Sequence, residues 1–328
     1  MTYDPTFNHV DNKASLNYIS NQLEYNLSEF LDYGFVYAGG FINVKASGDN
    51  IYGVAPYKLY PVNDPNYKNG QVWQTVRKNW VYESGIGGSA AYGSLGKTPV
   101  YITGIHVGGI GGTLVNDETA GTYSHDLDYK NGRVIFDSAI SNTTNLVLNY
   151  SYKWVQVYNY ADADFWQEIQ YATDNNETHL NSRTKGDFTT DPKNRVQLPA
   201  VVLETVPRSS STPHRIGDHS LVVDQDILIH IIADNYFERN NITDIIKLQE
   251  DRVIKMYDIN TVSKSGVYTF KFDGQLNANR IGYKELVNNN DYFYNTCRLK
   301  DMVVSSVESV NPDLFESTIR TTAEIIVV

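Results

Sequence analysis

Cysteine, long apolar runs and positive charge are all scarce in this sequence. Its 328 residues include one cysteine, Cys297, which excludes an internal disulfide and a zinc site built from cysteines. No run approaches the roughly 18 apolar residues of a membrane-spanning helix. The opening residues are polar and lack the apolar segment of a secretory signal. We therefore expect no membrane contact, and a protein kept inside a cell or in a particle assembled there.

Acidic residues outnumber basic ones by 38 to 27, which gives a formal net charge of −11 and a pI near 5.1. This balance argues against non-specific binding to nucleic acid or to an anionic membrane. We expect double-stranded DNA at most to pass close to such a surface. Hydrophobic residues make up 41% of the chain, enough for a core, and the 25 tyrosines favour strands and large contact surfaces.

An amphipathic helix is predicted after an extended arm of residues 1–14. Ser15 can cap its first turn, and Gly34 can end it. Its apolar stripe has spacings of three and four residues and consists of Leu16, Ile19, Leu23, Leu27 and Phe30. The pattern leaves open whether this stripe packs on the chain's own core or on a neighbouring subunit. We take these five residues, with Lys97, as the candidate assembly interface.

Short strands broken by glycine and proline are predicted to follow, in a β-rich region of residues 35–180. Within it, residues 72–85 fit either a strand pair or a short helix. Asn131 and Gly132 separate two strand-like segments and predict a type I′ hairpin turn, in which both residues need a positive φ.

A long polar stretch, residues 172–194, separates this region from the last third of the chain. A short helix from Asp162 to about Tyr171 is predicted just before it. Because long polar segments without periodicity are typical of loops and linkers, we place a domain boundary there.

Residues 195–328 predict strands around a helix. A strand over 195–207 and a polar turn lead to a strand over 221–234, which is apolar on both faces in its second half and is therefore expected at the centre of a sheet. Asn235 and Glu238 fit the start of a helix. Further strands are predicted over 267–272, 295–310 and 317–328.

The expected fold class is α+β, mostly antiparallel β with an N-terminal amphipathic helix and a C-terminal module of one sheet and one or two helices. The predicted parts are an arm and helix (1–34), a β-rich domain (35–180) and an α+β domain (195–328).

Three segments imitate ligand-binding motifs. Gly96, Lys97 and Thr98 match the end of a phosphate-binding loop, but Ala91 stands where that loop needs glycine and Pro99 prevents a following helix. The glycine-rich residues 104–113 lack the helix that a dinucleotide-binding fingerprint requires. In residues 125–132, Lys130 occupies a position that a calcium loop gives to a ligand. We expect no cofactor and no bound small molecule.

The seven histidines have no metal-site spacing, so we expect no metal either. His230 lies in an apolar run, with Asp226 and Asp234 four residues away on each side. We interpret it as a buried, hydrogen-bonded structural histidine rather than as part of a catalytic dyad. No other catalytic pattern is present, and we expect the protein not to be an enzyme.

Six segments of running sequence resemble a family of virion structural proteins from contractile-tailed bacteriophages, especially those that infect marine cyanobacteria. These segments are Tyr33–Val44, Pro61–Ile86, His125–Ile140, Asn149–Trp166, Arg195–Arg208 and Val223–Asp251. The order of elements in the last third also looks like that of a tail-terminator or head-to-tail joining module.

This resemblance implies a virion protein of the neck. It would form a homo-oligomeric ring, expected to be six-fold, at the head-to-tail junction, contact other neck and tail proteins, and let DNA pass through its channel. One alternative is a structural protein elsewhere in the tail, such as the baseplate. Another is a glycan- or receptor-binding module on the tyrosine-rich β region, since exposed aromatic rings stack on sugars.

Overall fold

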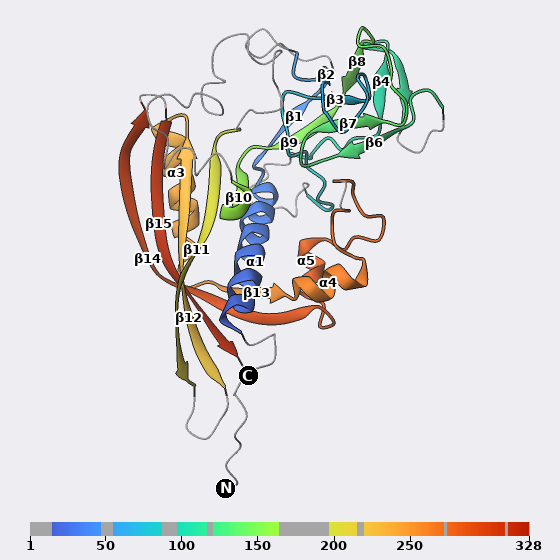
Figure 1. The fold of residues 1–328 in the computed structure, drawn as a ribbon. Coiled ribbons are helices and arrows are strands. Elements are labelled where there is room, and N and C mark those ends of the chain that lie inside the picture. Colours follow the sequence, from blue (N-terminus) through green and yellow to red (C-terminus); the bar gives the residue numbers. More distant parts are fainter. Residues whose placement is uncertain are drawn as a thin grey trace.

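The computed structural model describes residues 15–46, 55–86, 97–116, 121–163, 197–214, 220–271, 274–311 and 314–327. The predicted α+β class is confirmed: most strand pairs are antiparallel, a long helix stands at the N-terminal end, and a sheet with helices forms the C-terminal part. Figure 1 shows the long strands at the left, the short strands of the β-rich region at the upper right, and helix α1 between them.

The C-terminal sheet has six strands in the order β10-β11-β12-β15-β14-β13. Only β10 and β11 run parallel. The predicted central strand is confirmed, because β12 lies between β11 and β15 along its whole length. The strands are β10 (Gln156–Asn159), β11 (Ala200–Pro213), β12 (Leu221–Ala233), β13 (Val253–Tyr257), β14 (Phe293–Asn311) and β15 (Leu314–Val327).

The prediction of a polar turn after residue 207 is wrong. Strand β11 continues through Pro213, and after a shift in register Ser209–Pro213 pair with Leu221–Gln225 of β12. Backbone hydrogen bonds to the neighbouring strand hold this serine-rich segment extended, and these do not depend on side-chain polarity.

Helix α1 (Leu16–Tyr37) begins at Ser15 as predicted, and the Ser15 hydroxyl accepts a hydrogen bond from the Tyr18 N–H at 3.2 Å. Its predicted end at Gly34 is wrong, since the helix continues to Tyr37. The buried side chains of Phe35 and Val36 stabilise this last turn, and their packing outweighs the cost of about 1 kcal/mol that glycine brings to a helix.

Helix α3 (Tyr236–Lys247) begins at the predicted cap, where the Asn235 side-chain oxygen accepts from the Glu238 N–H at 2.8 Å. Helices α1 and α3 contribute to one apolar cluster with the C-terminal sheet. Its members include Ile19, Leu23, Leu27, Val201, Ile227, Ile229, Ile231, Ile242, Ile246, Ile254, Ile319 and Ile325.

Between β13 and β14 the chain forms two short helices, α4 (Ile259–Ser265) and α5 (Tyr283–Leu286). The strand predicted over 267–272 is wrong, since the described part of this segment has only a single bridge from Phe270 to Leu276. Strand β13, which the sequence pattern did not indicate, pairs with β14 instead. Its five residues are too few for a clear alternation.

The described residues of the β-rich region form three small sheets. They are β2-β3-β7-β6, β5-β4-β8 and the pair β1-β9. Residues 72–85 form one short strand followed by irregular chain, not a helix. The strands are β1 (Phe41–Val44), β2 (Tyr60–Val62), β3 (Val72–Gln74), β4 (Ile105–Val107), β5 (Thr113–Val115), β6 (His125–Asp128), β7 (Arg133–Phe136), β8 (Leu146–Leu148) and β9 (Tyr150–Lys153).

The β6–β7 hairpin is confirmed, but its predicted turn type is wrong. Asp128 pairs with Arg133 across a four-residue connection, and of the two turn residues only Gly132 has a positive φ, +63°. The Asp128 carboxylate accepts from the Asn131 backbone N–H at 3.1 Å and from the Asn131 side-chain amide at 2.7 Å. These bonds hold Asn131 in the ordinary negative-φ region, so the turn closes with one glycine.

The three predicted parts are grouped differently in the structure. Helix α1 belongs to the core of the C-terminal sheet, and β10, placed in the β-rich domain by prediction, is a strand of that same sheet. The 3-10 turn η2 (Tyr160–Asp162) ends at Asp162, where the predicted helix was to begin. The remainder of that helix and the predicted boundary over 172–194 lie outside the described residues.

Candidate functional site

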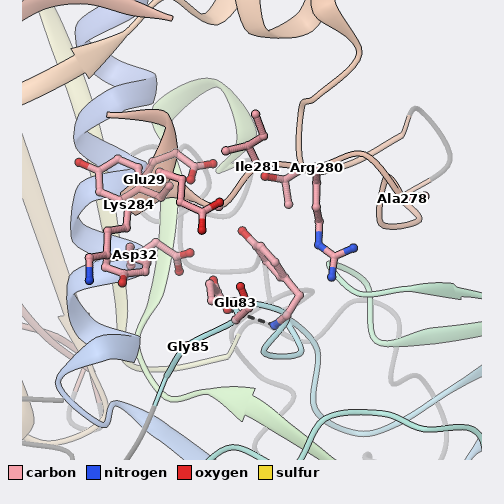
Figure 2. A pocket seen from close by; sticks show the side chains of 15 residues that line it. Glu29, Asp32, Glu83, Gly85, Ala278, Arg280, Ile281 and Lys284 are labelled. Carbon is pink, nitrogen blue, oxygen red and sulfur yellow. Dashed lines mark hydrogen bonds between the residues drawn. The ribbon is translucent and has the colours of Figure 1, made fainter. Parts of the chain in front are cut away.

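A cavity of about 440 Å³ lies where three parts of the chain meet. Helix α1, the loop after β3 and the segment before α5 each contribute to its wall. Glu29 and Asp32 project from α1, Glu83 faces them from the loop, and Arg280 lies across the space (Figure 2). The aromatic part of the wall consists of Tyr33, Tyr82 and Tyr283.

A buried lysine joins two of these carboxylates. Lys153, at the end of β9, has a side chain only 2% exposed, and its ammonium lies 2.5 Å from an oxygen of Asp32 and 2.5 Å from an oxygen of Glu83. Burial disfavours the charged ammonium, but the two carboxylates outweigh that effect and raise the pKa of Lys153. The ammonium also lies 4.4 Å from the centre of the Tyr82 ring. Lys153 is therefore protonated at neutral pH, and it ties α1 to the β-rich region.

Glu29 adds a third carboxyl group to the same cluster. It lies one turn before Asp32 on α1. Burial, and then the charge of Asp32, raise the pKa of Glu29 to about 7, although Lys153 acts in the opposite direction. Burial also raises the pKa of Glu83, against the effect of Lys153. Two carboxylates thus contact the ammonium, and a third carboxyl group, that of Glu29, lies one helical turn from Asp32.

The far wall of the cavity is fixed to the β-rich region by aromatic contacts. Phe270 lies edge-on to Tyr82, with ring centres 4.8 Å apart, and the Lys130 ammonium lies 5.2 Å from the Phe270 ring. Gly274 approaches the β6–β7 hairpin so closely that a Cβ there would lie 2.6 Å from an oxygen of Asp128. The segment between α4 and α5 therefore closes the cavity over the cluster of Glu29, Asp32, Glu83 and Lys153, which we call the junction cluster.

The predicted assembly interface does not form one surface. Ile19, Leu23 and Leu27 are buried in the chain's own core, so these three are not available to a neighbouring subunit. The reason is that the C-terminal sheet of the same chain covers the apolar stripe of α1. Of the remaining predicted residues, Phe30 is half-buried and packs against the same core, whereas Leu16, 43% exposed, and Lys97 are at the surface.

His230 is a buried, hydrogen-bonded histidine, as predicted. Its Nε2 lies 3.0 Å from an oxygen of Glu204, and its Nδ1 lies 3.3 Å from the Thr318 hydroxyl. Asp226 instead accepts hydrogen bonds from Arg320 and Thr322 on β15. Asp226 therefore pairs elsewhere, and the acidic neighbours of His230 come from the two adjacent strands, Glu204 of β11 and Glu316 of β15, whose oxygen lies 3.9 Å from Nδ1.

No group of three or more metal-ligating side chains occurs among the described residues. In the calcium-like segment the Asp128 carboxylate is occupied by Asn131, as its hairpin requires. Within the same part of the chain, no helix is long and apolar enough to cross a membrane.

The sequence did not indicate the junction cluster. Glu29 and Asp32 are spaced i, i+3 beside the apolar stripe of α1, a position typical of a solvated helix flank. Lys153 is the last residue of β9, whose four residues are all buried. Because a lysine is almost never fully buried unless it is paired, a lysine in this apolar and aromatic segment was the one sequence signal of the cluster.

Comparison with known protein families finds no matching family model, and no curated protein matches the chain.

Proposed function

We propose that this protein is a structural component of a tailed-phage virion, which assembles as a ring at the head-to-tail junction. The observation that carries the assembly role is the outer face of α3. Phe237 is 63% exposed and Leu248 is 80% exposed, and Ile245 lies on the same face. Apolar side chains gathered on one exposed helix face are typical of protein–protein contacts.

The two sides of α3 differ in a way that supports this proposal. Ile242 and Ile246 point into the core, so packing within the chain already accounts for one stripe of the helix. Phe237, Ile245 and Leu248 form a second stripe, which packing within the chain does not account for. A single amphipathic stripe would be enough to hold the helix on its sheet.

The shape of the sheet also suits an assembly. Strand β12 begins at one end of the sheet and β15 begins at the other, because Leu221 pairs with Val327 at one end and Ala233 pairs with Phe315 at the other (Figure 1). Contacts in a ring are heterologous, so a subunit needs two different surfaces. The two ends of one long sheet supply different surfaces for two neighbours.

The charge of the chain agrees with a channel role. The net charge of −11 would keep DNA from binding to a wall on which acidic residues face the lumen. The resemblance of six segments to virion proteins of contractile-tailed phages is the basis for placing the ring at the neck.

Mass photometry of the purified chain, alone and mixed with extracts that contain other neck proteins, tests assembly. The informative variant is Leu248→Asp, and its matched control is Leu114→Asp, which changes a leucine of the β-rich region that is also exposed. We expect ring-sized species in the wild type and the control, and monomers in Leu248→Asp.

Labelling of the protein in intact particles tests its place. A label at the neck supports the proposal, whereas a label at the baseplate would support the alternative of a structural protein elsewhere in the tail. A chain that stays monomeric in every mixture and is absent from particles would overturn the proposal.

A glycan-array signal that is lost on changing exposed tyrosines such as Tyr67 would favour the receptor-binding alternative.

A further inference from the structure

The C-terminal sheet has one long edge that the rest of the described chain does not pair. Strand β14 is bonded to β15 on one side as far as Asn311, but β13 pairs with its other side only from Phe293 to Arg298. Among the described strands, β13 is the only neighbour of β14 on that side. Figure 1 shows this part of β14 as the outermost strand at the left. From Val303 onward, the outer edge of β14 therefore has no neighbouring strand among the described residues.

The other edges of the same sheet carry features that oppose further pairing. Beyond its pairing with β10, strand β11 has a shift in register between Thr205 and Ser209, and Pro207 within it has no N–H to donate. On β13 the Tyr257 N–H donates to the Asn26 side-chain oxygen at 2.9 Å, and the Tyr257 carbonyl accepts from the Asn26 amide at 3.0 Å. Bulges, prolines and covering side chains are the usual protection of a sheet edge.

The backbone of β14 points its bonding groups outward at alternate residues. The Met302 N–H donates to the Glu250 carboxylate at 3.0 Å, and the Met302 carbonyl accepts from the Lys247 ammonium at 2.6 Å. Both partners belong to the end of α3 and the connection that follows it, on the side of β14 away from β15. Because these groups alternate in direction along a strand, those of Val304 and Ser306 also point away from β15. The pairing with β15 is regular over these residues.

The sequence of this edge is uncharged and self-complementary. From Val303 to Val307 it reads Val-Val-Ser-Ser-Val, with no proline, glycine or charge. Val303 is 63% exposed and Val304 is 42% exposed. In an antiparallel pair of two such edges centred on Ser305, Val303 lies opposite Val307, and Val304 lies opposite Ser306. Valine then faces valine, and no like charges oppose each other in this stretch, which favours pairing.

We propose that the open edge of β14 pairs with the same edge of a second copy of this chain, antiparallel and centred on Ser305. In this register Val304 of each copy lies opposite Ser306 of the other, and each such pair exchanges both N–H···O bonds. The two six-stranded sheets then join into one continuous sheet.

This contact is separate from the contacts of a ring. A two-fold pair is isologous and closes after two chains, whereas ring contacts are heterologous, so the pair does not rest on the proposed ring. The paired stretch is short, and small contacts are weak, so we expect pairing at micromolar concentrations and not at the nanomolar concentrations of mass photometry.

Cross-linking tests the register. Directly opposed residues of a non-hydrogen-bonded antiparallel pair have Cα atoms about 4.5 Å apart, which a disulfide can span. We expect Ser305→Cys to become mostly a disulfide-linked dimer on mild oxidation at micromolar concentration. Ser306→Cys is the control and should cross-link little, because its opposite residue is Val304. The native Cys297 is buried and does not compete.

A second pair of variants tests the backbone bonds. Val304→Pro removes an N–H that points away from β15, so the fold of the single chain should be kept, as circular dichroism can check. The pair loses one bond at each of its two symmetric sites, and its dissociation constant should rise on the order of 30-fold. Val304→Thr, which keeps the N–H and a β-branched side chain, is the control and should pair as the wild type does. Sedimentation velocity across a concentration series measures both.

Three results would overturn the proposal. One is a wild type that stays monomeric at every micromolar concentration. Another is equal cross-linking of Ser305→Cys and Ser306→Cys. The third concerns hydrogen exchange: the amides of Val304 and Ser306 should become protected as the concentration rises. Protection of these amides in the monomer would mean that other residues of the same chain occupy the edge.

Discussion

The β-rich region and the C-terminal sheet hold themselves together in different ways. Strands β11, β12, β14 and β15 are 13 to 19 residues long and carry an aliphatic core. Strands β1 to β9 are three or four residues long, and their core combines aliphatic side chains with large aromatic ones, of which Trp73, Trp80, Phe136 and Tyr150 are fully buried. Long strands are held by many backbone hydrogen bonds, whereas short strands depend on a few large side chains and their polar contacts.

The largest expected effect comes from removing one of those aromatic side chains. Trp80 is fully buried, and its indole N–H donates to the Thr75 hydroxyl and to the Arg77 carbonyl, both at 3.1 Å. Trp80→Ala should lower the free energy of unfolding by about 3–5 kcal/mol, because it leaves a cavity and removes the indole donor from two buried acceptors. Urea unfolding measures the change.

The control for Trp80 is Tyr67→Ala, which removes an exposed aromatic ring of the same region and should change stability by about 0.5 kcal/mol or less. Hydrogen exchange shows how far the damage spreads. If amides of β12 and β15 lose protection together with those of β3 and β9, the two regions unfold as one unit and the contrast between them does not extend to stability.

Loss of the buried ammonium is expected to have an effect of similar size. Lys153→Met leaves the carboxylates of Asp32 and Glu83 without their shared cation, and breaking a buried ion pair on one side costs about 3–5 kcal/mol. The loss should be greatest at pH 8 and smaller at pH 5, because Glu29 and Glu83, whose pKa values are raised, accept protons as pH falls. Thermal unfolding at the two pH values measures this difference.

A matched control for Lys153 is Lys284→Met, since Lys284 lines the same cavity but is exposed. It should leave stability nearly unchanged at both pH values. An equal loss in the two variants would mean that the cluster gives the junction no particular strength.

The sequence predicted the features that depend on neighbouring residues and missed those that depend on distant ones. The apolar run of β12 predicted a central strand, and the caps at Ser15 and Asn235 predicted two helix starts, because each depends on residues close together in the chain. The course of β11 beyond residue 207 depends on pairing with β12, which no local pattern records. The fold class was therefore predictable, but the full lengths of the strands were not.

The candidate site was less predictable than the fold. Lys153 meets Asp32 across 121 positions of sequence, so its charge is balanced by a residue that only the fold brings near. The stripe of α1 was identified correctly as apolar, but an apolar stripe does not specify its partner. Ile19 and Leu23 proved to be core residues because the C-terminal sheet of the same chain covers them.

Leu23→Ala distinguishes the core role of α1 from an assembly role. Leu23 is fully buried, so the variant should lose about 3 kcal/mol of stability, as expected for a truncated core leucine, whereas Leu16→Ala on the exposed first turn should lose less than about 0.5 kcal/mol. Urea unfolding gives both values, and mass photometry gives the size of the assembly. If Leu23→Ala left stability unchanged but gave smaller assemblies, this stripe would be part of the assembly interface and not of the core.

The smallest expected effect tests whether local caps matter in the long-stranded region. Asn235→Ala removes the side-chain oxygen that accepts from the Glu238 N–H at 2.8 Å, and loss of such a cap costs about 1 kcal/mol. Asn241→Ala, in the exposed middle of α3, is the control and should be neutral or slightly stabilising, because alanine is the better helix former. Since β12 is paired on both sides, we expect the loss to appear as faster hydrogen exchange in the first turn of α3 and not in the strand that precedes it. Equal acceleration in β12 would show that this cap stabilises the sheet as well as the helix, and that the C-terminal sheet depends on single side chains as the β-rich region does.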